Sequence, residues 1–195
     1  MRSRELRSIL SFLNNPYCDI KSSWFWKIVV QFMYYTGVRR LQLVTLVWRD
    51  IDFENNTVYL SVEGEKTDIE RSVPLENNLL DELSKYKKRM MLINPEACLP
   101  NKQLFNITEI NSRYSGTIMR DTQLTGFFVR LKRKTGISIS AHVLRHTMAT
   151  EIAKTGKIKP LQQILGHSNI STTLNFYVHP DMDELRGAIQ GLNIN

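Results

Sequence analysis

Hydrophobic residues recur at helical spacing through much of the chain and predict a mainly helical protein. The first helix is expected over residues 3–13, where the apolar side is formed by Leu6, Ile9, Leu10 and Leu13. The second should begin at a serine cap, Ser22 or Ser23, run through Tyr35 and end at Gly37. Its aromatic residues are expected in the core: Trp24, Phe25, Phe32 and Tyr35. Arg39 would then stand at the start of a short helix over residues 40–46.

From Trp48 to Leu75 the pattern changes from helical spacing to an alternation of apolar and polar residues. Three short runs show it: Ile51 and Phe53, then Val58, Leu60 and Val62, then Val73 and Leu75. Asn55-Asn56 and Glu63-Gly64-Glu65 separate these runs, which predicts two hairpins with Lys66 at the tip of the second. The expected fold class is therefore mainly α with a small three-stranded antiparallel β-sheet, in the α+β class.

Helical patterns return in the second half of the chain. Residues 79–91 and the basic stretch 122–134 are predicted helices, and Ser140 should cap another over residues 141–154. A short helix over residues 159–165 should end at Gly166. Residues 94–120 have little periodicity and are expected to form a long surface connection that tolerates insertion, with a short strand or turn near Leu104-Phe105.

The last part of the chain predicts two further helices. Ser171-Thr172-Thr173 should start one that carries Tyr177, and a terminal amphipathic helix is expected after Pro180. The apolar residues of the terminal helix are Met182, Leu185, Ile189 and Leu192. The 195 residues suit one well-cored domain, so residues 1–195 are expected to form a single domain.

A formal net charge of +7 favours a polyanionic partner. The basic run at Lys85, Lys87, Lys88 and Arg89 is interpreted as a solvated helix face. A second run is formed by Arg130, Lys132, Arg133 and Lys134, shortly before His142 and Arg145. This run and Arg40 are expected to contact a nucleic-acid backbone.

Cysteine usage and hydropathy narrow the cellular setting. Cys18 and Cys98 stand far apart without metal-ligand spacing, which supports neither a disulfide framework nor a zinc site. No apolar run reaches the length needed to span a membrane, and the longest candidate, residues 28–35, is interrupted by Gln31. A cytoplasmic location is expected.

Chemistry-bearing residues gather late in the chain: His142, Arg145, His167 and Tyr177. Such a set suits phosphodiester chemistry, because an arginine fork stabilises the charge that develops on phosphate oxygens. A tyrosine can store the broken strand as an ester, and a lysine or histidine can protonate the departing sugar oxygen. His142 and Arg145, three residues apart on one helix, should share a face and reach the same phosphate.

The ordered pattern resembles the catalytic domain of the tyrosine recombinase (phage integrase) family, from about Ser3 to His179. Thr36-Gly37-Val38-Arg39 is similar to the family's first arginine box, and Lys66 falls where the hairpin lysine sits. His142 and Arg145 match the His-x-x-Arg box; His167 follows a Leu-Gly pair, and Tyr177 precedes Val178-His179. One departure is Gln42, where many relatives carry Glu; its amide can still accept a hydrogen bond.

The resemblance implies a site-specific recombinase or integrase that cleaves and rejoins DNA through a 3′-phosphotyrosyl intermediate at Tyr177. Arg39 and Arg145 would neutralise the phosphate, His142 and His167 would donate hydrogen bonds or handle protons, and Lys66 would protonate the leaving oxygen. No metal, other cofactor or small-molecule ligand is implied. The expected partners are double-stranded DNA and further copies of the chain in a tetramer, with residues 179–195 exchanged between protomers. The separate N-terminal DNA-clasping domain of such recombinases is expected to be absent.

Other interpretations stay open at this point. The chain could be a non-catalytic DNA-binding regulator derived from a recombinase, or a type IB topoisomerase-like enzyme that relaxes DNA. Arg145 could form only a structural ion pair, with Glu151 or Asp121. His146 and His179 are interpreted as core or capping residues, and Arg40 is expected on a different helix side from Arg39.

Overall fold

The computed structural model describes residues 1–62, 69–114 and 118–167. Several expected features lie outside these ranges: the hairpin tip with Lys66, the helix carrying Tyr177, His179, and the terminal segment 179–195.

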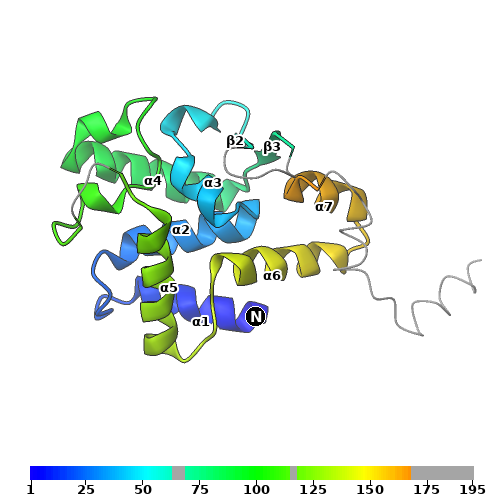
Figure 1. Ribbon diagram of the computed structural model, residues 1–195, viewed down its shortest axis with the longest axis horizontal. Helices are drawn as coiled ribbons and strands as arrows, with labels where there is room; N and C mark the ends of the chain where they lie inside the picture. Colours follow the sequence, from blue (N-terminus) through cyan, green and yellow to red (C-terminus); the bar gives the residue numbers. More distant parts are fainter. Residues whose placement is uncertain (63–68, 115–117, 168–195) are drawn as a thin grey trace, which may run out of the picture.

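The described part is mostly helical, as expected (Figure 1). Its α-helices are α1 (Ser3–Asn14), α2 (Ser23–Thr36), α3 (Arg40–Thr45), α4 (Asn77–Ile93), α5 (Asp121–Thr135), α6 (Ala141–Ala153) and α7 (Ile158–Leu165). Three short 3-10 helices accompany them: η1 (Trp48–Asp50), η2 (Pro95–Cys98) and η3 (Ile107–Glu109). Helix α2 is central, because it packs against α1, α4 and α6. No helix within the described ranges has the length and apolar character needed to cross a bilayer.

The expected helix boundaries are confirmed to within a few residues, and glycines end three of the helices. Gly37, Gly136 and Gly166 follow α2, α5 and α7 with φ of 61°, 70° and 68°, the left-handed conformation that favours glycine. Ser140 caps α6, since its Oγ accepts a hydrogen bond from the Val143 amide at 3.2 Å. Ser22 stands at the N-cap position of α2, as expected, but its side chain forms no capping hydrogen bond.

The antiparallel sheet is also confirmed, with strand order β1-β2-β3. Its strands are β1 (Ile51–Asp52), β2 (Thr57–Leu60) and β3 (Arg71–Pro74). Val58 pairs with Val73 and Leu60 with Arg71, so the buried residues Val58, Leu60 and Val73 share the face that meets the core. The strands are shorter than the alternation suggested, because Phe53, Val62 and Leu75 lie beyond their ends.

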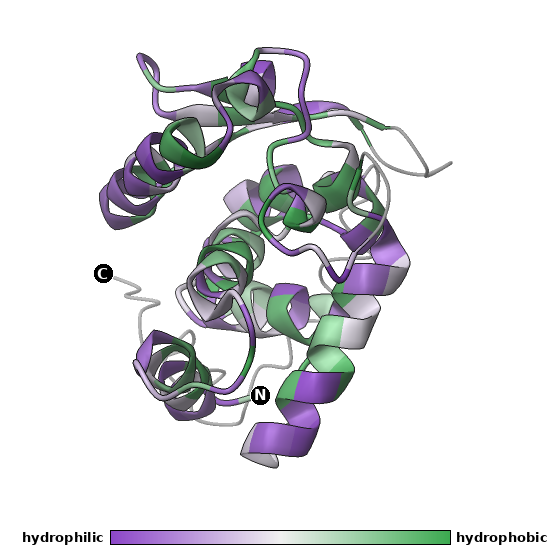
Figure 2. Cartoon of the chain, turned by 90° about the vertical axis from the view of Figure 1, so that its left-hand side faces the viewer, coloured by the Kyte–Doolittle hydropathy of each residue, from purple (hydrophilic) through white to green (hydrophobic). Residues whose placement is uncertain are grey.

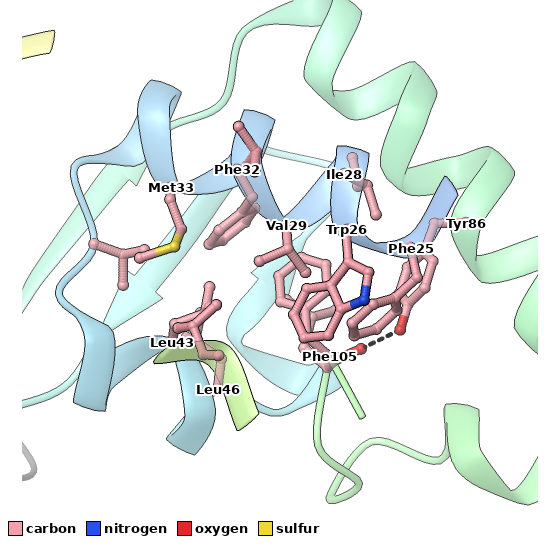
Figure 3. Packing of buried hydrophobic residues seen from close by; sticks show 14 of the residues in the cluster. Phe25, Trp26, Ile28, Val29, Phe32, Met33, Leu43, Leu46, Tyr86 and Phe105 are labelled. Atoms are coloured by element: carbon pink, nitrogen blue, oxygen red, sulfur yellow. Dashed lines mark hydrogen bonds between the residues drawn. The ribbon is translucent and has the colours of Figure 1, made fainter. Parts of the chain in front are cut away.

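The core centres on aromatic rings contributed by separate parts of the chain (Figure 3). Phe25 and Phe32 of α2 meet Phe105 edge to face, and Trp26 stacks on Phe127 of α5 with ring centroids 4.1 Å apart. The Tyr86 hydroxyl is also buried and donates to the Leu104 carbonyl at 2.8 Å. Colouring by hydropathy shows hydrophobic and hydrophilic residues on the same helices (Figure 2).

Two of the expected core aromatics are less buried than predicted. Trp24 is half-buried, and its ring lies under the Arg89 guanidinium, 3.9 Å from Arg89 Cζ. Tyr35 is 40% exposed. The neighbouring basic run on α4 is a solvated helix face, as expected, because Lys85, Lys88 and Arg89 are exposed; Lys85 also forms a surface ion pair with Glu82.

The connection over residues 94–120 is more deeply packed than expected. Leu104 and Phe105 are buried, the Leu104 amide donates to the Leu46 carbonyl at 2.8 Å, and Gln103 forms an isolated bridge with Val47. The expectation that an insertion would be tolerated near Leu104-Phe105 was therefore wrong, because these two residues complete the aromatic core.

We predict that Phe105→Ala lowers the free energy of unfolding by about 3–5 kcal/mol, because it removes a fully buried ring that contacts three aromatic neighbours. Ile118→Ala, in the same connection but 55% exposed, is the matched control and should cost about 1 kcal/mol or less. Urea denaturation followed by tryptophan fluorescence measures both. Equal losses in the two variants would contradict this account of the core.

Candidate active site

A cleft of about 810 Å³ lies between α5, α6 and the start of α3. Seven of its lining residues are cationic or capable of becoming so: Arg39, Arg40, Lys132, His142, Arg145, His146 and His167. No carboxylate is among the described residues that line it. Four of the six residues expected to be catalytic thus come together: Arg39, His142, Arg145 and His167. The cleft is electrostatically suited to an anion.

Arg145 is the most constrained of these residues, with only 7% of its surface exposed. Its Nη1 donates to the Gly37 carbonyl at 2.5 Å, and its Nη2 donates to the Leu165 carbonyl at 2.7 Å. These carbonyls stand at the C-terminal ends of α2 and α7, where helix dipoles concentrate partial negative charge. The guanidinium therefore cross-links three helices while still lining the cleft.

The expected structural alternative for Arg145, an ion pair with Asp121 or Glu151, fits poorly. Asp121 pairs with Arg40 at 3.4 Å, and Glu151 pairs with Lys154 at 3.0 Å. Arg145 is held by main-chain acceptors, which leaves its positive charge uncancelled by those two carboxylates.

Arg39 stands at the N-cap position of α3 and is half-buried at the cleft. Its backbone amide donates to Gln42 Oε1 at 3.2 Å, while Gln42 Nε2 donates to the Ser61 carbonyl at 2.8 Å. The expected acceptor role of Gln42 is confirmed, although the bond comes from the Arg39 main chain. The donor role was missed by the sequence analysis, and it matters because a glutamate could not donate to Ser61.

His142 and His146 lie one helical turn apart on α6, with parallel rings whose centroids are 6.2 Å apart. Both side chains are exposed and line the cleft. The interpretation of His146 as a core or capping residue was therefore wrong. Partial burial lowers the pKa of His146 below its ordinary value, and the neighbouring His142 and the chain's N-terminus lower it further. The spacing of four from His142 was the available signal.

His167 follows Gly166 directly and is half-buried. Its backbone amide donates to the Gln162 carbonyl at 3.2 Å, and its carbonyl accepts from Gln162 Nε2 at 2.9 Å. These bonds direct the imidazole to Arg145, where His167 Nε2 lies 3.4 Å from Arg145 Nη2. The α7 C-terminus thus supplies both an acceptor for Arg145 and a histidine beside it.

The residues expected to contact a nucleic-acid backbone separate into two groups. Arg40 lines the same cleft as Arg39, so the expectation of a different side was wrong; Asp121 and Thr125 of α5 hold its guanidinium. Lys132 also lines the cleft.

The other residues of the second basic run are not in the cleft lining. Arg130 donates to the Tyr114 hydroxyl at 2.8 Å, and Lys134 pairs with Asp19. Arg133 is exposed in the last turn of α5, where a cation also stabilises the negative end of the helix dipole.

Comparison with known proteins agrees with this arrangement. The family model described as "Phage integrase family" matches residues 1–184. Tyrosine recombinase XerC of Staphylococcus aureus is 32% identical over 165 residues, which is 82% of this chain and 50% of the relative. Tyrosine recombinase XerA of Pyrococcus furiosus is 28% identical over 169 residues, 86% of this chain and 54% of the relative.

A solved structure extends the likeness to the fold. The Tn1549 transposon integrase in complex with circular intermediate DNA superposes with a TM-score of 0.77 at 25% identity, covering 97% of this chain and 66% of that one. The chain spans about half the length of the curated relatives it matches.

We predict that Gly37→Ala destabilises the protein more than Gly136→Ala does. Both glycines have positive φ, of 61° and 70°, so alanine at either costs about 1–2 kcal/mol in backbone strain. A Cβ at Gly37 would in addition overlap the buried Met148 methyl, which adds about 1 kcal/mol because the flexible Met148 side chain must repack, whereas a Cβ at Gly136 meets nothing within 4 Å. Urea denaturation of both variants measures the difference, and equal costs would contradict the packing argument.

Proposed function

Because the chain belongs to the phage integrase family, the tyrosine recombinases, we propose that it cleaves and rejoins DNA strands by transesterification at Tyr177. The cleft supports this most directly, because Arg145 is fixed there by two main-chain carbonyls with Arg39, His142 and His167 around the same space. A phosphodiester under attack gathers negative charge on its non-bridging oxygens, and cations held in place beforehand stabilise that charge without reorganising.

In the proposed reaction the Tyr177 hydroxyl gives its proton to His142 or His167, and its oxygen forms a bond to the scissile phosphorus while the bond from phosphorus to the 5′ oxygen breaks. Lys66 protonates the departing oxygen, which leaves a 3′-phosphotyrosyl ester and a free 5′-hydroxyl. Attack by another 5′-hydroxyl reverses these steps and rejoins a strand. One ester replaces another of similar energy. Tyr177 and Lys66 enter this proposal from the sequence pattern alone.

The described residues take complementary roles in the proposal. Arg145 offers the further N–H groups of a planar guanidinium whose orientation is set by the Gly37 and Leu165 carbonyls. Arg39 adds a second guanidinium at the N-terminal side of α3. His142 and His167 donate hydrogen bonds to the phosphate or handle protons, and His167 is already next to Arg145, 3.4 Å away.

The proposed partner is double-stranded DNA. The net charge of +7 and the cationic cleft lining favour it. The Tn1549 integrase, solved in complex with DNA, gives further support. Self-association on DNA, with residues 179–195 exchanged between protomers, completes the proposal.

We predict that the protein forms a covalent adduct with a nicked suicide duplex, visible on a denaturing gel, and that Tyr177→Phe abolishes the adduct because it removes the attacking oxygen. Tyr17→Phe is the matched control; it removes a phenolic oxygen from a residue that is 94% exposed, and adduct formation should be unchanged. An adduct that persists in Tyr177→Phe would refute the assigned nucleophile. Absence of any wild-type adduct, with DNA binding retained, would favour a regulator, and relaxed plasmid without recombinants would favour a topoisomerase-like enzyme.

We predict that Lys132→Ala and Lys134→Ala differ in the salt dependence of DNA binding. Lys132 lines the cleft, so its loss should reduce the slope of log K against log salt concentration by about one unit. Lys134, which pairs with Asp19, should change the slope less. Fluorescence anisotropy with a labelled duplex between about 50 and 200 mM salt measures both slopes. A larger reduction in Lys134→Ala would place the DNA path elsewhere on α5.

A further inference from the structure

Arg71 reaches from the sheet to the end of α7. It is the first residue of β3, where it pairs with Leu60, and it is absent from the cleft lining. Its Nε donates to the Ile164 carbonyl at 2.6 Å. A side chain of the sheet thereby binds the last turn of a helix that is distant in sequence; Figure 1 shows α7 beside β3.

Two arginines therefore bind consecutive carbonyls of α7. Arg71 donates a hydrogen bond to the Ile164 carbonyl, and Arg145 donates one to the Leu165 carbonyl. The last carbonyls of a helix lack intrahelical partners and carry the negative end of its dipole, so cationic donors are favourable there. The end of α7 is held jointly by guanidinium groups from β3 and α6.

The Arg71 guanidinium also packs against Gly166, the residue before His167. A Cβ at Gly166 would overlap Arg71 Nη1 and lie 2.8 Å from Arg71 Cζ, so this close approach requires glycine. Ile69, just before β3, forms a main-chain hydrogen bond to the same residue: its amide donates to the Gly166 carbonyl at 3.4 Å. Gly166 and the end of α7 are thus fixed from the sheet.

We propose that Arg71 is a positioning residue for the active site. It sets the Gly166-His167 backbone and thereby keeps the His167 imidazole beside Arg145. The inference rests on the proposed function, because it concerns the residues that would bind the scissile phosphate. Arg71 acts through His167 and does not contact the substrate. Misplacement of a phosphate-binding group by about 1 Å is enough to slow chemistry on the order of a hundredfold.

The first test measures the placement of His167 without any reaction. Long-range proton–nitrogen NMR spectra of the full chain report the imidazole resonances, with the His167 signals identified from a His167→Gln spectrum. Arg71→Ala should shift the His167 signals, and Arg71→Lys should shift them less because the positive charge near the carbonyls remains. Arg49→Ala, which removes a guanidinium from an exposed residue of η1, should leave them unchanged. His167 signals in Arg71→Ala that superimpose on those of wild type would overturn the proposal.

A second pair of variants acts from the glycine side and keeps Arg71 in the chain. Gly166→Ala should shift the same signals, because its Cβ displaces the guanidinium. Gly156 also has a positive φ, of 73°, so alanine there causes similar backbone strain, but its Cβ would meet nothing within 4 Å. Gly156→Ala should therefore leave the His167 signals unchanged. Equal shifts in both would count against a role for the Arg71 contact. This pair applies even where Arg71→Ala folds poorly.

The third test uses single-turnover cleavage of the suicide duplex at saturating DNA. Arg71→Ala should slow cleavage by about tenfold to a hundredfold, and should slow it little further in a His167→Ala background, because both changes act through the same imidazole. Independent, multiplying losses would overturn the proposal, since they would mean that Arg71 acts by another route. A wild-type protein without cleavage would refute the proposed function, while the NMR comparison would still decide the role of Arg71.

Discussion

The arrangement of the cleft depends on one buried guanidinium. Arg145 is almost entirely removed from solvent and gives two hydrogen bonds to main-chain carbonyls, one at the end of α2 and one at the end of α7. Burying a charge is unfavourable unless hydrogen bonds and dipoles compensate for it, and two helix C-termini supply both. Gly37 and Gly166 follow these helices with positive φ, the conformation that favours glycine at a helix C-terminus. The same contacts that make the burial tolerable also fix the direction in which the positive charge faces the cleft.

These two carbonyl bonds also bear on function, because dipoles at two helix ends orient the guanidinium without adding a formal negative charge to the cleft. Arg40, which lines the same cleft, pairs with Asp121 of α5, a residue outside the cleft lining. Arg40 thereby joins α3 to α5, and in the proposed reaction Arg145 is the cation held in place for the scissile phosphate.

The small sheet contributes to the site through side chains that leave it or bind to it. Gln42 joins the start of α3 to the Ser61 carbonyl just beyond β2, and Arg71 joins β3 to the end of α7. Arg39 and His167 each lie next to one of these links. A sheet of only ten residues in three strands is thus linked to two edges of the cleft.

The sequence by itself determined the elements and most of the cluster. Helical spacing, glycine stops and the Ser140 cap located the helices, and alternation located the sheet, because these signals are local properties of the backbone. The ordered boxes also identified Arg39, His142, Arg145 and His167. Only the tertiary structure decided what supports them: Leu104-Phe105 proved to be core, His146 entered the cleft, and Arg71 and Gln42 proved to be links. Such roles depend on contacts between residues far apart in the chain, and no periodicity in a single sequence encodes which carbonyl a guanidinium will meet.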